Sequence, residues 1–156
     1  MKLAGLFVTR RTAFKVSGLG AIAIAATGGL PALADSASVE KTNIQTVKDF
    51  CLAWADDPPD ADKMVDQFMT DDCLVRFGDK VGPVTGRSAA AALFRSFLAN
   101  GERYDLKILE TFARGPVVVN SRTDSTLKGT RSTNPTPVVG VFILRDGKIR
   151  EWSDYA

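Results

Sequence analysis

Two pairs of residues near the C-terminal end of the chain could carry acid–base chemistry. Arg122 and Asp124 lie two positions apart after the apolar run "VVV", and Trp152 and Asp154 have the same spacing in the last segment. Because side chains alternate across a β-strand, each pair points to one face of its strand. A guanidinium between two carboxylates can leave them in unequal environments, so that one holds a proton while the other is ionised. Such a cluster could donate one proton and accept another in one reaction.

The same residues also fit an interpretation without chemistry. Charged side chains are mostly exposed, so Arg122 and Asp124 could form a surface ion pair worth about 0–1 kcal/mol, and Asp154 could lie in water. Asn120 shares the predicted strand face of Arg122 and Asp124, and Trp152 could supply an aromatic wall for an apolar ligand. The pattern alone leaves both interpretations open. The other large apolar side chains are expected to pack in the core, among them Phe77, Leu93, Phe97, Phe112 and Phe142.

The elements that must position these residues begin with helices. Apolar residues at helical spacing predict an amphipathic helix over residues 44–55 and a second helix over residues 61–69, separated by the loop "DDPPDAD". The four aspartates of this loop suggest calcium ligands, but the loop lacks the glycine and the terminal glutamate of an EF-hand. Asp60 is also well placed to cap the second helix. A turn with a helix cap is therefore the preferred interpretation.

Strands dominate the second half of the chain. Residues 73–77 are predicted to form a strand and residues 82–87 a turn, after which Ser88 is expected to cap a helix that stops at Gly101. From Tyr104 onward, period-two runs are separated by turn residues, with "RDGK" as a tight hairpin turn. Helices followed by strands predict an α+β fold. Its N-terminal helices would pack on a curved antiparallel or mixed sheet, forming a cone that encloses a pocket.

Residues 1–34 are predicted to be a cleaved export signal. They have a basic start, an uncharged stretch rich in Ala and Gly, and "ALA" before Asp35. The adjacent Arg10 and Arg11 in "TRRTAFK" are typical of a twin-arginine signal. A membrane anchor is the alternative, but glycines and a proline make the stretch weakly apolar for the ~20 residues that a bilayer requires. Residues 35–156 then form a single domain, which we expect to be periplasmic or secreted.

Composition excludes several classes of function. The chain has 20 Lys and Arg against 18 Asp and Glu, but four of the basic residues lie within the predicted signal. The remainder is slightly acidic and has no basic run, so neither nucleic acid nor an anionic membrane is an expected partner. Histidine is absent from the sequence, which excludes Ser-His and Cys-His nucleophiles and histidine-ligated metal sites. We expect no metal and no organic cofactor.

The two cysteines, Cys51 and Cys73, leave a question of redox state open. In an exported protein they could form a disulfide. Cys51 lies on the apolar face of the first predicted helix, however, and buried free thiols are common. The sequence does not decide between a disulfide and two free thiols.

The segments "RTD" and "VVGVFILRDGKIREWSDY" resemble the limonene-1,2-epoxide hydrolase family of the NTF2-like (SnoaL-like) superfamily. The similarity runs over residues 44–155 and takes in "DDCLVRF" and "GPVTGR". It implies an NTF2-like cone and a cofactor-independent hydrolysis of a small lipophilic epoxide to a diol. On this resemblance Asp154 is the base that draws a proton from water, Asp124 is the acid that protonates the epoxide oxygen, and Arg122 bridges them.

The family also holds the attacking water with a tyrosine and an asparagine, two residues apart on the strand before the "PVTGR"-like turn. An ungapped register places Arg76 and Gly78 at these positions. Arg76 would add positive charge and lower the pKa of an adjacent carboxylate. Asn120 could supply a water contact instead, which is a hypothesis.

Two further functions fit the same fold. One is a non-catalytic protein that binds a small apolar ligand, and the other is an isomerase or cyclase of the ketosteroid-isomerase kind, for which Tyr104 and Tyr155 are the available tyrosines. Tyr155 should point away from Asp154, because the two are neighbours on one strand. The open strands of such a sheet are also expected to pair two subunits as a homodimer.

Overall fold

The computed structural model describes residues 30–78 and 81–156. The predicted export signal therefore lies almost entirely outside the described residues. The described elements are, in order, α1 (Leu30–Ala53), α2 (Ala61–Phe68), β1 (Met69–Phe77), β2 (Val81–Thr85), α3 (Arg87–Phe97), the short 3-10 helix η1 (Ala99–Gly101), β3 (Arg103–Arg114), β4 (Val117–Lys128), β5 (Arg131–Arg145) and β6 (Lys148–Tyr155).

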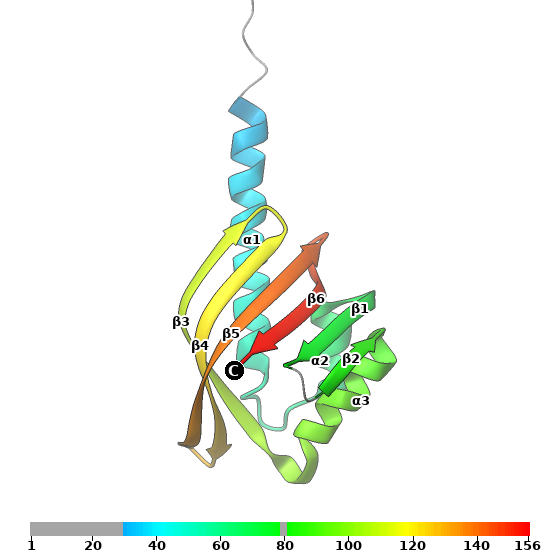
Figure 1. The fold of residues 1–156 in the computed structure, drawn as a ribbon, viewed down its shortest axis with the longest axis vertical. Coiled ribbons are helices and arrows are strands. Elements are labelled where there is room, and N and C mark those ends of the chain that lie inside the picture. The colour runs from blue at the N-terminus through cyan, green and yellow to red at the C-terminus, as the bar shows by residue number, and fades with distance from the viewer. Residues whose placement is uncertain (1–29, 79–80) are drawn as a thin grey trace, which may run out of the picture.

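The six strands form one curved mixed sheet in the order β2-β1-β6-β5-β4-β3. Neighbouring strands are antiparallel except β1 and β6, which run parallel. Figure 1 shows α1 crossing behind the sheet, with α2 and α3 together beside β1 and β2. Helices on one face of a curved sheet leave a hollow at its wide end. The predicted α+β cone is confirmed.

An aromatic core fills the space between α1 and the sheet. Val47, Phe50 and Cys51 form the buried face of α1 and Trp54 follows just after it, as the helical spacing predicts. Phe50 makes an edge-to-face contact with Trp152 of β6 at a centroid distance of 4.9 Å, an arrangement that aromatic pairs favour. The core thus ties the strand that carries Asp154 directly to α1.

Polar side chains of α1 also hold the ends of two hairpins. Asn43 donates from Nδ2 to the carbonyl oxygen of Gly115 at 3.1 Å, and Glu40 accepts from the Gly115 amide at 2.8 Å. Thr46 donates to the carbonyl oxygen of Gly147 at 3.1 Å. The three helix residues are three positions apart and so share one face of the helix. Hydrogen bonds from this face fix α1 across the β3–β4 and β5–β6 turns.

Several local predictions are confirmed. Asp60 caps α2, its Oδ1 accepting from the Lys63 amide at 3.0 Å. The "RDGK" segment is the turn between β5 and β6, with Asp146 and Gly147 at positive φ.

The structure answers one question that the sequence left open. Cys51 and Cys73 are both buried and free, so they form no disulfide with each other. None of the described helices is long and apolar enough to cross a membrane.

Other local predictions are wrong. The predicted turn over residues 82–87 is mostly strand β2, because Val84 and Thr85 pair with β1. Ser88 lies inside α3 rather than capping it. The N-cap is Gly86, whose φ of 86° suits glycine. The first helix begins at Leu30 rather than at residue 44.

Candidate active site

Arg122, Asp124 and Asp154 form one buried cluster at the inner face of the sheet. Arg122 Nε donates to Asp124 Oδ1 at 2.7 Å, and Nη2 donates to Asp124 Oδ2 at 3.1 Å. The same Nη2 donates to Asp154 Oδ2 at 2.5 Å. The Arg122 side chain is fully buried, whereas those of Asp124 and Asp154 are 24% and 12% exposed. The structure therefore places the predicted pair inward, not on the surface.

The last strand positions Asp154 through its neighbour. Trp152 Nε1 donates to Asp154 Oδ1 at 2.6 Å, as the shared strand face predicts. The Trp152 ring also lies 5.9 Å from the Arg122 Cζ, within range of a cation–π contact. Asp154 thus receives a hydrogen bond on each carboxylate oxygen, which fixes the orientation of its carboxyl group.

Burial and neighbouring charges shift the pKa values of this cluster in opposite directions. Burial raises the pKa of Asp154 above its ordinary value, and the charge and hydrogen bonds of Arg122 only partly offset that effect. Burial alone would lower the pKa of Arg122, but the charges of Asp154 and Asp124 outweigh it and raise that pKa. Arg122 therefore stays charged, while Asp154 is a stronger base than an exposed aspartate.

The Arg122 side chain fits against β5 because residue 140 is a glycine. A Cβ atom at Gly140 would collide with Arg122 Nη1 and lie 2.8 Å from Asn120 Oδ1. Gly140 pairs with Asn120 on one side and with Asp154 on the other. Gly140 was not among the site residues predicted from the sequence. Its only sequence signal is a glycine inside an apolar strand, which often marks the close approach of another group.

Asn120 lies within the buried part of the cluster. Its Oδ1 accepts from Arg122 Nη1 at 3.0 Å, and its Nδ2 donates to Cys51 Sγ at 3.7 Å. The side chain is 0% exposed, and Asn120 is not among the described residues that line the cavity beside the cluster. The structure therefore shows Asn120 in contact with Arg122, and its water contact stays a hypothesis.

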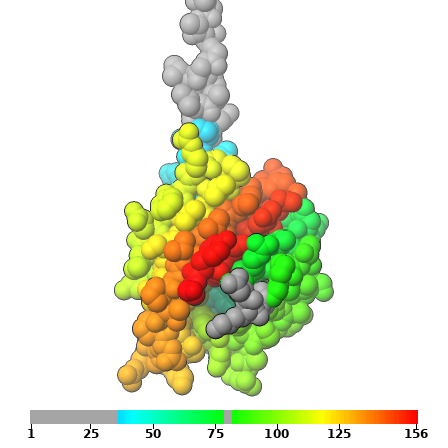
Figure 2. Space-filling view, viewed as in Figure 1, coloured from blue at the N-terminus to red at the C-terminus, as the bar shows by residue number. Residues whose placement is uncertain are grey.

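A cavity of about 700 Å³ opens beside the two carboxylates. Figure 2 shows a hollow in this face, beside the end of β6. The volume is that of a typical small-molecule site. Most of its wall is aromatic or aliphatic, with Asp124 and Asp154 as its acidic groups. Its aromatic and aliphatic wall includes Trp54, Phe77, Phe97, Tyr104, Leu106 and Trp152.

Arg76 and Gly78 both border the cavity, but Gly78 has no side chain and Arg76 belongs to a different strand face from Asp154. Arg76 is exposed and in register with Ser153, which lies on the opposite face from Asp154. Phe77, in register with Asp154, lies on the inner face, its ring 4.7 Å from that of Trp152. Gly78 donates its backbone amide to the Asp154 carbonyl oxygen at 3.0 Å. The inner face is therefore aromatic at this position.

Two further cavity residues, Trp54 and Tyr104, come from segments that do not carry the charged cluster. Trp54 is buried, and its indole N–H has no hydrogen-bond partner among the described residues. The Tyr104 hydroxyl donates to Glu102 at 3.1 Å and lies 3.3 Å from the carbonyl oxygen of Phe97. Tyr104 is thus already engaged at the wall. Trp54 belongs to the helix predicted over residues 44–55, and its helical spacing alone indicated burial rather than a place in the cavity wall.

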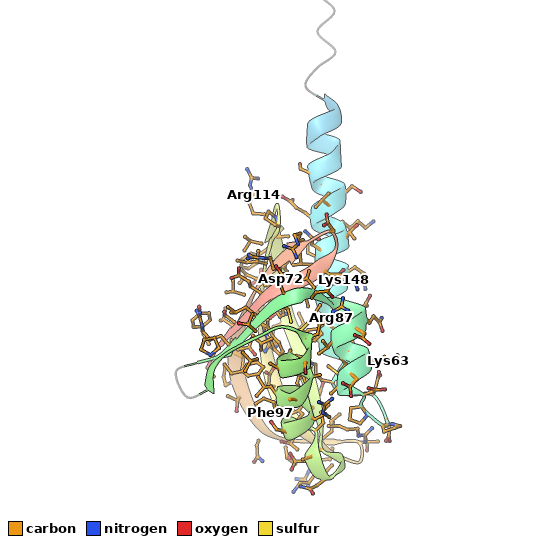
Figure 3. All side chains as sticks on the ribbon, turned by 90° about the vertical axis from the view of Figure 1, so that its right-hand side faces the viewer. Lys63, Asp72, Arg87, Phe97, Arg114 and Lys148 are labelled. Atoms are coloured by element: carbon orange, nitrogen blue, oxygen red, sulfur yellow. The ribbon has the colours of Figure 1, made fainter. Side chains whose placement is uncertain are left out.

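Other charged side chains form ion pairs on the outside of the domain. Figure 3 shows Asp72, Arg87 and Lys148 on one side of the molecule. Asp72 pairs with Arg145, whose hydrogen bond lowers the pKa of Asp72 to about 2. Arg87 pairs with Asp71 at 3.0 Å. Within the part of the chain that the structure describes, no group of three or more acidic or cysteine side chains is arranged to hold a metal ion.

Comparisons with known proteins identify the family of the chain. The model of the limonene-1,2-epoxide hydrolase catalytic domain matches residues 41–156, so the chain belongs to this family. A solved structure of an LEH-like epoxide hydrolase from M. tuberculosis is 27% identical with a TM-score of 0.61, covering 74% of this chain and 83% of that chain. No curated protein matches the chain.

More distant structures share the fold alone. A SnoaL-like protein from Jannaschia sp. CCS1 is 21% identical, with a TM-score of 0.56 and coverage of 75% of this chain and 86% of that chain. A protein with a ketosteroid isomerase-like fold from Catenulispora acidiphila, in complex with trimethylamine, is 16% identical with a TM-score of 0.59. The match covers 71% of this chain and 84% of that chain. One fold that serves several chemistries leaves the function to the site residues.

Proposed function

We propose that the protein hydrolyses a small lipophilic epoxide to a diol in one step without a cofactor. The observation that carries this proposal is the buried Arg122 held between Asp124 and Asp154 at the wall of an aromatic cavity. A site that only binds an apolar ligand has no evident need for two carboxylates bridged by a guanidinium. The apolar wall suits the carbon skeleton of the substrate, and the two carboxyl groups suit its strained oxygen ring.

Each carboxyl group has a role in the proposed step. Asp154, whose pKa is raised by burial, takes a proton from a water molecule as the water oxygen attacks a ring carbon. The carbon–oxygen bond opens, and Asp124 gives its proton to the leaving epoxide oxygen. Arg122 stays charged and keeps the two carboxyl groups in place. The proton gained by Asp154 must return to Asp124 before the next turnover.

The test is diol formation from a panel of small epoxides that includes limonene oxide. We expect the wild-type protein to form the diol and Asp154→Asn and Asp124→Asn to lower the rate by at least about 100-fold, because each removes one proton transfer. Because the asparagine amide has nearly the same shape as the aspartate carboxylate, both variants should keep the fold, which circular dichroism checks. A folded wild-type protein that forms no diol from any of the epoxides would contradict the proposal.

A second candidate function is binding of a small apolar molecule without chemistry. The position of Phe77 favours it, because an aromatic ring occupies the inner face beside Asp154 and Gly78 has no side chain to hold a water. Quenching of tryptophan fluorescence by ligands distinguishes the two functions when combined with the diol assay. Saturable quenching by limonene, with no diol formed from limonene oxide, would favour binding alone. The isomerase alternative is weaker, because Tyr104 already donates to Glu102 and Tyr155 points away from Asp154.

We also propose that the protein is a homodimer that pairs through the outer face of the sheet. Phe112, expected in the core, is 54% exposed, because it pairs with Val119 on the outer face. Val139 and Tyr155, a register pair of β5 and β6, are exposed on the same face. Contiguous apolar surface of this kind marks protein interfaces. Light scattering should give twice the chain mass for the wild type and the single mass for Phe112→Asp. A wild-type monomer would contradict the dimer.

Export by the twin-arginine route remains a proposal that rests on the sequence. Arg10→Lys together with Arg11→Lys should abolish export in a host with this pathway while leaving the protein folded in the cytoplasm. Exported protein in unchanged amount would contradict this route.

A further inference from the structure

Asn120 is the polar residue of the cluster for which the proposed step has no role. Its side chain is fully buried and does not line the cavity beside the carboxylates. Buried amides are costly unless their donors and acceptors are satisfied. Both groups of this amide have partners, Arg122 on the oxygen and Cys51 on the nitrogen. A satisfied amide at the centre of a charged cluster indicates a positioning role.

The contacts of Arg122 divide its guanidinium into two sides. Nε and Nη2 face Asp124 and Asp154, while Nη1 donates to Asn120 Oδ1 at 3.0 Å. Gly140 lies directly across from Asn120, and its missing side chain leaves the space for Nη1. The planar guanidinium is therefore held at both edges, which fixes the rotation that lets one nitrogen bridge two carboxylates.

Cys51 fixes the orientation of the amide itself. The side chain of asparagine can turn by half a rotation and exchange its oxygen and nitrogen. Cys51 Sγ accepts from Asn120 Nδ2, and burial raises the pKa of the thiol to about 12, so the sulfur remains neutral. The amide oxygen is then directed at Arg122. Hydrogen bonds of the Asn120 amide thus connect Cys51 of α1 to the guanidinium of Arg122.

We propose that Asn120 is the positioning residue of the site: its amide, oriented by Cys51, holds Nη1 of Arg122 so that Nε and Nη2 bridge Asp124 and Asp154. The proposal rests on the proposed epoxide hydrolysis for its kinetic consequences but not for its structural ones. A neutral amide is also required at this position. A carboxylate would add a third negative charge, and an apolar side chain would leave a buried N–H of Arg122 unsatisfied.

The titratable groups around Asp154 bear on any test that varies pH. The charges of Arg122 and Asp124, both on β4, act on the pKa of Asp154. Cys51 of α1 belongs to the same cluster but is a neutral thiol, because burial raises its pKa to about 12. The remaining titratable residues at the cavity wall are Arg76, Tyr104 and Tyr155. Arg76 lies in register with outward-facing Ser153, and the Tyr104 hydroxyl donates to Glu102.

Three variants of the full chain test the proposal. Asn120→Ala removes the contact to Nη1, Asn120→Asp keeps its shape but adds a charge, and Ser121→Ala is the matched control on the opposite face of β4. Two properties are measured: the pH dependence of kcat and KM for diol formation, and the side-chain Nε–H signal of Arg122 in nitrogen-15 NMR spectra. The second needs no catalytic activity.

We expect Asn120→Ala to lower kcat by about 10- to 100-fold with KM nearly unchanged, because a mispositioned group weakens the transition state more than binding. Its Arg122 Nε–H should exchange with solvent faster. For Asn120→Asp the acid limb of the rate profile should move up by about one pH unit, since a like charge raises the pKa of Asp154. Ser121→Ala should match the wild type in both properties.

The outcomes separate the two proposals. If the wild type forms no diol, epoxide hydrolysis fails, and the Arg122 signal alone decides the role of Asn120. If Asn120→Ala does not fold, Asn120→Asp decides through its pH profile and its Arg122 signal. An Arg122 signal and a rate profile unchanged in the folded Asn120 variants would overturn the positioning role. Cys51→Ala should show the same changes as Asn120→Ala to a smaller degree. If its rate profile and its Arg122 signal equal those of the wild type, Cys51 does not orient the Asn120 amide.

Discussion

Gly140 leaves open the space in which the guanidinium of Arg122 lies, since a Cβ there would collide with Nη1. Overpacking of a filled core typically costs about 1–3 kcal/mol. We therefore expect Gly140→Ala to lower the free energy of unfolding by that amount and to lower the rate of diol formation. Gly82→Ala is the control, because a Cβ at Gly82 meets no heavy atom within 4 Å. Equal stability of the two variants in urea denaturation would contradict this account.

The raised pKa of Asp154 predicts the pH at which the reaction slows. If Asp154 is the base, it must be ionised, and the rate should fall on the acid side with a midpoint above the ordinary value of 3.8. If Asp154 were instead the acid, the rate would fall on the alkaline side of the same pKa. The profile of kcat against pH distinguishes the two roles. A single alkaline limb at that pKa would exchange the roles of Asp124 and Asp154.

The same shift predicts how stability depends on pH. Because the folded protein holds the Asp154 proton more tightly than the unfolded chain, this group's contribution to stability is fully present below pH 3.8 and is lost as pH rises through the raised pKa. Asp154→Asn does not titrate. The free energy of unfolding of this variant, relative to wild type, should therefore increase from about pH 4 to about pH 7. A relative stability that decreases over this range would contradict the raised pKa.

The contacts of α1 with the hairpin turns predict a stability effect far from the cavity. Asn43 is 3% exposed and donates to the Gly115 carbonyl oxygen. Asn43→Ala should lower the free energy of unfolding by about 1–2 kcal/mol, because the buried carbonyl loses that donor. Gln45→Ala, which removes an exposed hydrogen bond within α1, should change it by less than about 0.5 kcal/mol. Thermal unfolding that ranks the two variants the other way would show that this contact does not hold α1.

Period-two alternation was enough to predict which C-terminal residues share a face. Arg122 with Asp124, and Trp152 with Asp154, lie together because strand geometry leaves no other arrangement for residues two positions apart. Their meeting in one cluster depends on the pairing of β4 with β5 and of β5 with β6, which the predicted hairpin turns favour. The α+β order of elements followed from the same periodicities.

The parts that could not be predicted depend on contacts between distant segments. The sequence around Gly140 shows only a glycine in an apolar strand. The role of Gly140 becomes visible only when the strand register places it opposite Asn120. An ungapped register placed Arg76 beside the carboxylates, whereas a register shift between Val75 and Phe77 and the pairing with β6 leave Phe77 on the inner face. The burial of Asn120 against Cys51 needs α1 packed on the sheet. None of these relationships is local in sequence.

The most direct test of the Arg122-bridged pair is a single turnover in water labelled with oxygen-18, with the protein in excess over limonene oxide. Direct attack by water, with Asp154 as base, predicts that the first diol formed carries one labelled oxygen. If a carboxylate attacked the ring instead, the first turnover would place an unlabelled carboxylate oxygen in the diol. Labelled diol supports the one-step acid–base mechanism, and unlabelled diol from the first turnover would contradict it.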